Sequence, residues 1–452
     1  MPELVELIAQ VDESYEDLLS VHRELVRIPS VNTGVMPTGN ETLVAEFAHE
    51  WLAEDGIESE ILEASAGRGN LIAELPGKSG ENKLLFMSHL DVVPVEDETK
   101  WKYQPFGAEI DGGRIYGRGA SDCKGLLACQ LMALRLLKRN GLQLSDNLIL
   151  ASGADEEHGG RYGFGWLAEN HPQKIKAPLA VNEGGGNHIN IAGTTTYLLG
   201  VGEKGRLEVK LTVKGSSAHA SIPWMGDNAT YKVAEVLKRI EGYEAERDTS
   251  SSIFNYLSTL AIEDLVTPQN VDRVIEDIKE NNPQLGSTLR ALSRMTLTPT
   301  MMAGGIKSNS VPEMCQITCD IRTLPHQDDS YARKELENIL GGLDGIDLEI
   351  DYMAIPNSSD YETEFASKIK EATRISLDRD DLNWIPAVST GFTDSRFLRP
   401  LGAITYGFNG SHPDDDPVLV RMHGTDESIG IKSLVSGTKI MLALAYDLLK
   451  VN

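Results

Sequence analysis

Short apolar segments that end in histidine or acidic residues most constrain the fold of this chain. The segment LLFMSHLDVVPV, residues 84–95, has the composition of a buried β-strand, yet it contains His89 and Asp91. Side chains alternate faces along a strand, so residues i and i+2 point the same way. The two side chains would lie together in apolar surroundings, where a charge is costly unless it is paired or bound. The fold must therefore provide a partner for them.

Strand and helix patterns alternate through the first third of the chain. Helical patterns cover residues 4–27, 41–56 and 123–141, and strand patterns cover 58–63, 70–75, 83–88, 147–153 and 177–182. This alternation is typical of an α/β domain with a mainly parallel central sheet. The same character returns from about residue 360, and a helix at 432–449 is expected to end the chain.

The pattern changes near residue 200. Residues 205–215 alternate apolar and polar side chains, as in a sheet with one solvated face. A helix at 228–241, strands at 314–322 and 346–353, and a helix at 330–343 complete an α+β unit. We expect one domain from residues 1–199 and 357–452, with residues 200–356 inserted into it. Residues 243–300 are too long for a plain loop, and we expect helices at 271–280 and 286–294.

Charge and cysteine content exclude several classes of function. The formal net charge of −26 argues against nucleic acid or an anionic membrane as a partner. No run of about 18 apolar residues predicts a membrane span, and the acidic N-terminal segment does not resemble a signal peptide. The four cysteines do not form a disulfide framework, which indicates free thiols in a reducing, cytoplasmic compartment.

Acidic residues and a histidine collect where predicted strands end. In open α/β sheets, binding groups gather past the carboxyl ends of the strands. Asp122 lies at the turn before a predicted helix, and the groups that follow predicted strands are His89, Asp91, Asp155, Glu156, Glu157 and Glu183. Carboxylates this close cannot all stay ionised without a cation. The sequence therefore predicts two divalent metal ions; the ligand types suit zinc, and cobalt or manganese would also fit.

Each of these signals also has an ordinary structural explanation. An H-x-D pair is often an internal hydrogen bond, and adjacent acids such as Glu156 and Glu157 often begin a helix. His423, in RMHGTDE, taken alone is more often a surface or core residue. Cys123 follows Asp122, but a thiolate is not required, and we do not expect it to be a ligand. The occurrence of all the signals together in this order favours the metal site.

The ordered motifs resemble a known enzyme family. The segments SHLDVVP, PFGAEIDGGRIYGRGASDCKG, GADEEHGG, VNEGGG, TDSR and RMHGTDESI are similar to those of the two-zinc hydrolases of metallopeptidase family 20. That family includes acetylornithine deacetylase, succinyl-diaminopimelate desuccinylase, aminoacylase, glutamate carboxypeptidase and several dipeptidases. The resemblance covers essentially the whole chain. It implies a zinc-exopeptidase-like catalytic domain with an inserted lid or dimerisation domain.

The resemblance implies a role for each matched residue. The implied metal ligands are His89, Asp122, Glu157, Glu183 and His423. Asp122 would bridge the two ions, Asp91 would orient the imidazole of His89, and Glu156 would be the general base.

Four further positions match residues that contact the reacting group or the substrate in the family. His219 would hold the oxyanion, either in the partner subunit of a homodimer or in its own site after closure. Arg396 would bind the substrate carboxylate, as a guanidinium fork does well. Asn309 and Arg322 would make further substrate contacts. Taken alone, His219 is a surface histidine on a turn, and Asn309 and Arg322 have equally ordinary explanations as a turn residue and an ion-pair residue.

The expected activity is hydrolysis of an amide bond in a small, carboxylate-bearing molecule. The first expectation is a dipeptidase or carboxypeptidase-like metallopeptidase acting on short peptides. The alternative is a deacylase of N-acyl amino acids, such as acetylornithine deacetylase or succinyl-diaminopimelate desuccinylase. Pocket residues decide between these substrates, and their preference cannot be read from the motifs.

Overall fold

The apolar strands lie in one ten-stranded sheet in the computed structural model, which describes residues 3–191, 193–260, 262–263 and 265–451. The main order is β1-β2-β6-β3-β7-β16-β9-β14, and β8 and β15 also pair with β9. The bounds are β1 Glu58–Glu63, β2 Gly69–Leu75, β3 Asn82–His89, β6 Asn147–Gly153, β7 Leu179–Asn182, β8 His188–Ile191, β9 Thr194–Glu203, β14 Asn357–Ser358, β15 Leu382–Ser389 and β16 Ile404–Gly407.

The centre of this sheet is parallel and its flanks are partly antiparallel. β6, β3, β7 and β16 run parallel, whereas β1, β2 and β6 pair antiparallel. The sheet is therefore mixed, and the expected parallel arrangement holds at its centre. The carboxyl ends of β3, β6 and β7 consequently meet at one edge, where the acidic residues follow.

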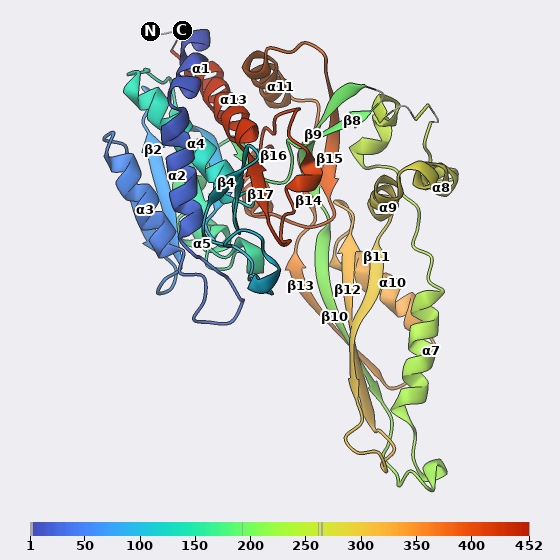
Figure 1. Ribbon diagram of the computed structural model, residues 1–452. Coiled ribbons are helices and arrows are strands. Elements are labelled where there is room, and N and C mark those ends of the chain that lie inside the picture. Colours follow the sequence, from blue (N-terminus) through green and yellow to red (C-terminus); the bar gives the residue numbers. More distant parts are fainter. Residues whose placement is uncertain (1–2, 192, 261, 264, 452) are drawn as a thin grey trace.

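Helices cover both faces of the large sheet (Figure 1). Phe86 points into a core shared with one layer of helices, and Met87 points into a second core on the opposite face. The first layer contains α1 Leu4–Glu13, α2 Tyr15–Arg27, α3 Thr42–Ala53, α4 Lys124–Arg139, α11 Glu364–Leu377 and α13 Ile431–Leu449. The second contains α5 Phe164–Asn170, α6 Pro172–Ile175 and α12 Ser395–Leu398. Burial on both faces explains why these strands are apolar throughout.

The single helix expected at residues 4–27 is two helices. The chain bends at Ser14, which ends α1 and begins α2. Serine is a weak helix former in a helix interior because its hydroxyl competes for backbone hydrogen bonds. The bend lets α1 pack on α13 while α2 packs on α4.

A second, antiparallel sheet projects from the larger part of the molecule (Figure 1). We call it, with α7 and α10, the distal unit. Its order is β11-β12-β10-β13, with β10 Gly205–Lys214, β11 Thr296–Gly304, β12 Met314–Thr323 and β13 Ile346–Ala354. The helices α7 Ala229–Glu241 and α10 Asp329–Leu340 share a separate hydrophobic core with this sheet. The alternating strands predicted near residue 205 thus have one covered face.

The division at residues 200 and 356 stays a prediction, and two observations bear on its boundaries. β9 extends the large sheet to Glu203, and β10 of the second sheet begins at Gly205, so Lys204 alone separates these two strands. The segment with α8 Val271–Asn281 and α9 Pro283–Leu292 contributes Phe254, Val274 and Leu289 to the larger core. This segment therefore packs with the large sheet and not with the distal unit.

A small sheet completes the fold beside the first strand edge. It has the order β17-β5-β4, with β4 Glu109–Asp111, β5 Arg114–Tyr116 and β17 Ser428–Gly430. This pairing joins the loop that carries His423 to the segment just before Asp122. Among the described helices, none is long and apolar enough to cross a membrane.

Candidate metal centre and active site

His89 is held at the carboxyl end of β3 with its ring fixed. Its Nδ1 lies 3.0 Å from the carbonyl oxygen of Asp91 and 3.4 Å from Asp91 Oδ1. Both side chains are buried. With Nδ1 donating to these oxygens, Nε2 presents its lone pair to the space beyond the strand, as a metal-ligating histidine does.

Asp91 also anchors the loop that follows β6. Its carboxylate accepts hydrogen bonds from the backbone N–H groups of Glu156 and Glu157, each 3.1 Å long, and from Asn32 Nδ2 at 2.8 Å. These three donors, together with His89 Nδ1 at 3.4 Å, surround a fully buried charge. Asp91 therefore fixes both the histidine and the backbone of the predicted general base.

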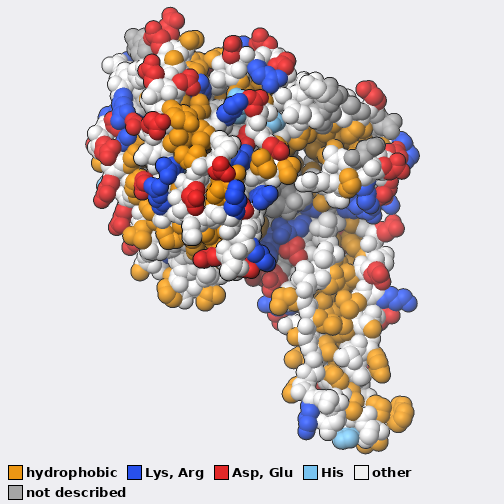
Figure 2. Space-filling model, viewed as in Figure 1, with side chains coloured by type: hydrophobic (Ala, Val, Ile, Leu, Met, Phe, Trp, Pro, Cys, Tyr) orange, Lys and Arg blue, Asp and Glu red, His pale blue; other side chains and the backbone are white. Residues whose placement is uncertain are grey.

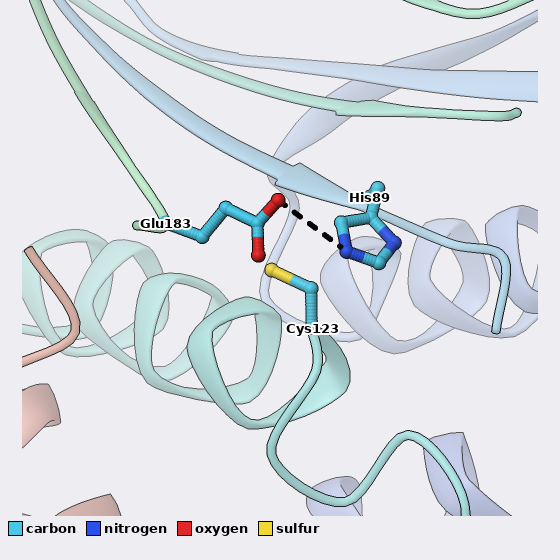
Figure 3. Close-up of side chains that lie close together, drawn as sticks. All are labelled: His89, Cys123 and Glu183. Atoms are coloured by element: carbon cyan, nitrogen blue, oxygen red, sulfur yellow. Dashed lines mark ion pairs between the residues drawn. The ribbon is translucent and has the colours of Figure 1, made fainter. Parts of the chain in front are cut away.

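Two further carboxylates face His89 Nε2. Asp122 Oδ1 lies 3.0 Å from this nitrogen and Glu183 Oε1 lies 3.6 Å from it. Figure 3 shows Glu183 extending from the end of β7 toward the ring. The backbone N–H of Asp122 donates to Glu427 Oε1 at 3.1 Å, which fixes this turn before α4. We call His89, Asp122 and Glu183 the buried half of the site.

His423 approaches the same aspartate from the other side. Its Nε2 lies 3.1 Å from Asp122 Oδ2 and 3.2 Å from Glu157 Oε2. Asp122 therefore directs one oxygen at each histidine, which is the arrangement of a bridging ligand. We call His423, Glu157 and the second oxygen of Asp122 the exposed half, because the His423 side chain is 54% exposed and that of His89 only 2%.

The crowded carboxylates shift the proton equilibria of the site. Burial, reinforced by the charge of Glu183, raises the pKa of Glu156 well above its usual range. Burial and the charge of Asp122 raise the pKa values of Glu157 and Glu183 to about 7. Hydrogen bonds to Asp122 and Glu157 raise the pKa of His423 to about 10. Without a metal, protons must compensate these negative charges.

The residues present fit two divalent cations. Positive charge from metal ions would replace the protons on the carboxylates, and imidazole with carboxylate is a common zinc donor set. Glu157 Oε1 is buried and has no hydrogen-bond partner among the described residues, so its lone pairs are free to bind a cation. The ligand roles predicted for the five residues stay predictions, and the geometry is consistent with each of them.

A buried ion network supports the loop of Glu156 and was not foreseen from the sequence. Arg68 Nη2 lies 2.7 Å from Glu41 Oε1 and 3.0 Å from Asp155 Oδ1, and Asn32 Nδ2 also reaches Asp155 Oδ1 at 3.1 Å. These residues come from four separate segments. Only Asp155 lies in a short motif, GADEEHGG, and the tertiary fold alone brings the four residues together.

Arg396 is buried beside the same loop. Its guanidinium lies between the rings of Phe392 and Phe397, and Nη1 donates to the carbonyl oxygen of Thr393 at 2.8 Å. Nη2 lies 4.0 Å from Asp394 Oδ1 and has no hydrogen-bond partner among the described residues. A β-carbon at Gly160, three residues after Glu157, would lie 3.5 Å from this nitrogen. The arginine predicted to bind substrate is thus close to the base loop, with one donor edge available.

The three remaining predicted residues lie in the distal unit. His219 and Ser310 form a β-bridge, and Ala220 N–H donates to the carbonyl oxygen of Asn309 at 3.0 Å. His219 and Asn309 are both exposed and thus lie together at one end of the distal unit. Arg322 instead pairs with Asp320 and donates to Thr390 O at 3.2 Å, where the distal unit meets the larger part.

Cys123, which the sequence analysis does not expect to be a ligand, offers a further potential metal donor. Its sulfur, a nitrogen of His89 and a carboxylate oxygen of Glu183 all lie within 4.8 Å of one another. The side chain is buried. The only signal in the sequence was its position directly after Asp122.

Comparison with known proteins identifies a family match and sequence relatives of this chain. A family model for Peptidase family M20/M25/M40 matches residues 85–447. The chain is 27% identical over 366 residues to a probable succinyl-diaminopimelate desuccinylase of Staphylococcus aureus (strain MRSA252), which covers 79% of this chain and 82% of that protein.

Two solved structures share the fold. An M20 family metallo-carboxypeptidase from Sulfolobus solfataricus has a TM-score of 0.72 at 22% identity, covering 95% of this chain and 98% of its own. Human carnosine dipeptidase 1 has a TM-score of 0.67 at 16% identity, covering 99% of each chain. All five predicted metal ligands lie within the residues that the family model matches. The chain therefore belongs to peptidase family M20/M25/M40, and it is a metal-dependent hydrolase of amide bonds.

Proposed function

We propose that this protein uses two zinc ions to cleave the amide bond of short peptides with a free carboxylate, as a dipeptidase or carboxypeptidase. The observation that carries the proposal is the convergence of Glu156 with two histidine–carboxylate groups at one sheet edge. Divalent ions held there would polarise the scissile carbonyl and acidify a water molecule.

Glu156 is suited to move the proton in this reaction. Its backbone is fixed by Asp91, and its carboxylate is buried among the ligand residues. A raised pKa lets the group take a proton from water and then pass it to the leaving amine. General acid–base catalysis of this kind contributes about a hundred- to ten-thousand-fold to the rate.

Arg396 supports a substrate with a free carboxylate. Its fixed guanidinium keeps Nη2 without a hydrogen-bond partner among the described residues, and a guanidinium binds a carboxylate by charge-assisted hydrogen bonds. The two aromatic rings hold the guanidinium plane and leave the edge as the place of contact.

A second candidate is the removal of an acyl group from an N-acyl amino acid. The sequence relative named a probable succinyl-diaminopimelate desuccinylase favours it. Both substrate classes place a carboxylate close to the scissile amide, so Arg396 serves either reaction.

A substrate panel tests the proposal and separates the two candidates. Zinc-loaded protein is assayed on dipeptides and on N-acetyl and N-succinyl amino acids, each with a free or an amidated carboxyl group. We expect hydrolysis of the free-carboxylate dipeptides. Hydrolysis of the N-acyl amino acids alone would select the deacylase, and no hydrolysis of any amide would contradict the proposal.

The same panel tests Arg396. Arg396→Leu should lower kcat/KM for free-carboxylate substrates by about 10- to 100-fold, the effect of losing a charge-assisted hydrogen bond of ~1.5–3 kcal/mol. Arg374→Leu, on an exposed face of α11, is the control. An equal loss on free and amidated substrates would show that Arg396 does not bind the carboxylate.

We further propose that the protein forms a homodimer through the distal unit, with His219 reaching the site of the partner subunit. Apolar side chains are exposed on this unit, among them Trp224 at 88% and Met301 at 69%. Figure 2 shows hydrophobic side chains along its surface. Exposed apolar patches mark association sites, and His219 follows β10 at the end of the distal unit that projects away from the large sheet (Figure 1).

Mixing two inactive variants tests this arrangement. His219→Ala and Glu156→Gln each lack one required group, but a mixed dimer combines an intact Glu156 in one chain with an intact His219 from the other. We expect the mixture to regain activity that neither variant has alone. Trp224→Asp with Met301→Asp should give monomers by sedimentation. Wild-type activity in such monomers would contradict the proposal.

We also propose a reducing, cytoplasmic compartment. The four cysteines are all buried free thiols, as expected where disulfides do not form.

A further inference from the structure

Cys123 occupies a position where a helix normally favours another residue. It is the N-cap residue of α4, and its side chain makes no capping hydrogen bond. Serine, threonine, aspartate and asparagine are preferred at this position because their oxygens satisfy the free N–H groups of the first turn. The cysteine makes no such capping bond, and its buried side chain lies beside His89 and Glu183 instead.

The sulfur points into the buried half of the site. Figure 3 shows the thiol directed into the space between the Glu183 carboxylate and the His89 ring. The three potential donor atoms lie within 4.8 Å of one another, close enough to surround one ion. Zinc–sulfur and zinc–nitrogen bonds of about 2.3 and 2.0–2.1 Å fit within that separation.

The exposed half has a different donor set. It consists of His423, Glu157 and the second oxygen of Asp122, with His423 Nε2 lying 3.1 Å and 3.2 Å from oxygens of the two carboxylates. These donors are nitrogen and oxygen only. Soft thiolate donors select zinc over harder ions such as manganese, so the two halves differ in the metals they favour.

We propose that Cys123 is a metal ligand of the buried half, which makes this half a mixed nitrogen, oxygen and sulfur site that favours zinc over manganese. The inference rests on the proposed function only in requiring a metal at His89 and Glu183. On binding, the S–H bond is replaced by a sulfur–metal bond and one proton is released to the solvent. The α4 N-terminus favours the resulting negative charge on sulfur.

Cobalt(II) replacement tests the sulfur ligand directly. A Co²⁺–thiolate bond gives an intense near-ultraviolet charge-transfer band, whereas visible d–d bands report any bound cobalt. We expect the charge-transfer band in the full-length wild-type protein and in Cys129→Ser, whose thiol lies within α4 against the carbonyl of Leu434. Cys123→Ser should keep the visible bands and lose the charge-transfer band. Its preference for Zn²⁺ over Mn²⁺ should fall by about tenfold or more.

Each result decides the inference. Cobalt bound by wild type with visible bands but no charge-transfer band overturns the sulfur ligand and leaves the metal site of the proposed function intact. A band that persists in Cys123→Ser also overturns it. No cobalt binding at all contradicts both. The wild-type spectrum suffices if the variant fails to fold, which circular dichroism would show.

Discussion

The two halves of the metal centre are built on different kinds of support. In the buried half, His89 and Glu183 follow adjacent parallel strands, β3 and β7, and Asp122 lies at the start of the buried helix α4. In the exposed half, His423 lies on a loop, in a left-handed conformation with φ 61°, and its side chain is 54% exposed. Only Asp122 belongs to both.

This difference predicts that the two halves bind their ions with different affinities. Groups on a packed sheet are held in place before the metal arrives, so binding costs little ordering. A loop-borne, half-exposed histidine must be ordered by the ion and competes with water. We therefore expect the buried ion to bind more tightly and to leave more slowly, and the exposed ion to be lost first.

Substitution of a residue predicted to bind the metal should give the largest effect, which is a loss of metal affinity. His89→Ala should weaken the buried ion by more than about 100-fold, beyond the 10- to 100-fold typical of residues that only orient a ligand. His423→Ala should remove the exposed ion and leave the buried one. Release of zinc to a chromogenic chelator should be biphasic in wild type, with only the slow phase in His423→Ala. A single fast phase in that variant would show that the buried half, and not the exposed half, releases its ion first.

Loss of Asp91 should affect both halves at once. Its carboxylate holds His89 on one side and the backbone of Glu156 and Glu157 on the other. Asp91→Asn should lower metal affinity and kcat by about 10- to 100-fold, with Asp97→Asn, an exposed acid, as the control. Loss of kcat at full metal occupancy with unchanged KM would show positioning. Wild-type kinetics would contradict the role.

The smallest effect expected is the pH dependence of stabilisation by zinc. Glu157 and Glu183 have pKa values of about 7, so protons and metal compete for them below that pH. The rise in Tm on adding zinc should therefore be large at pH 8 and shrink as pH falls through about 7. Differential scanning fluorimetry between pH 5 and 8 measures this. A rise independent of pH would mean that these groups do not bind the ion.

Much of the fold could be predicted from the sequence because periodicity reports burial. The apolar strands β3, β6 and β7 and the helix α4 were found because packing on both sides leaves them apolar throughout. The break at Ser14 was missed, since the hydrophobic pattern continues across it. The packing of residues 253–292 on the large sheet was also missed, because the surface that a helix contacts is not encoded in its own period.

The residues of the site likewise include some that the sequence predicts and some that only the structure reveals. His89, Asp122, Glu157, Glu183 and His423 were found because each lies in a short motif, and the structure brings these five side chains together. Arg68, Glu41 and Asn32 belong to no motif, and their roles arise only from tertiary contacts. Cys123 was not expected to be a ligand, and its role as one is a proposal; only the structure shows that its side chain faces His89 and Glu183 (Figure 3).

The most direct test of the account is the metal content and activity of Glu156→Gln measured on the same zinc-loaded sample. Glu156 is placed as the proton carrier and not as a ligand. The account predicts two zinc ions per chain, as in wild type, with hydrolysis of the best dipeptide or N-acyl substrate reduced by at least about a hundredfold. Full activity, or loss of zinc in parallel with activity, would contradict it.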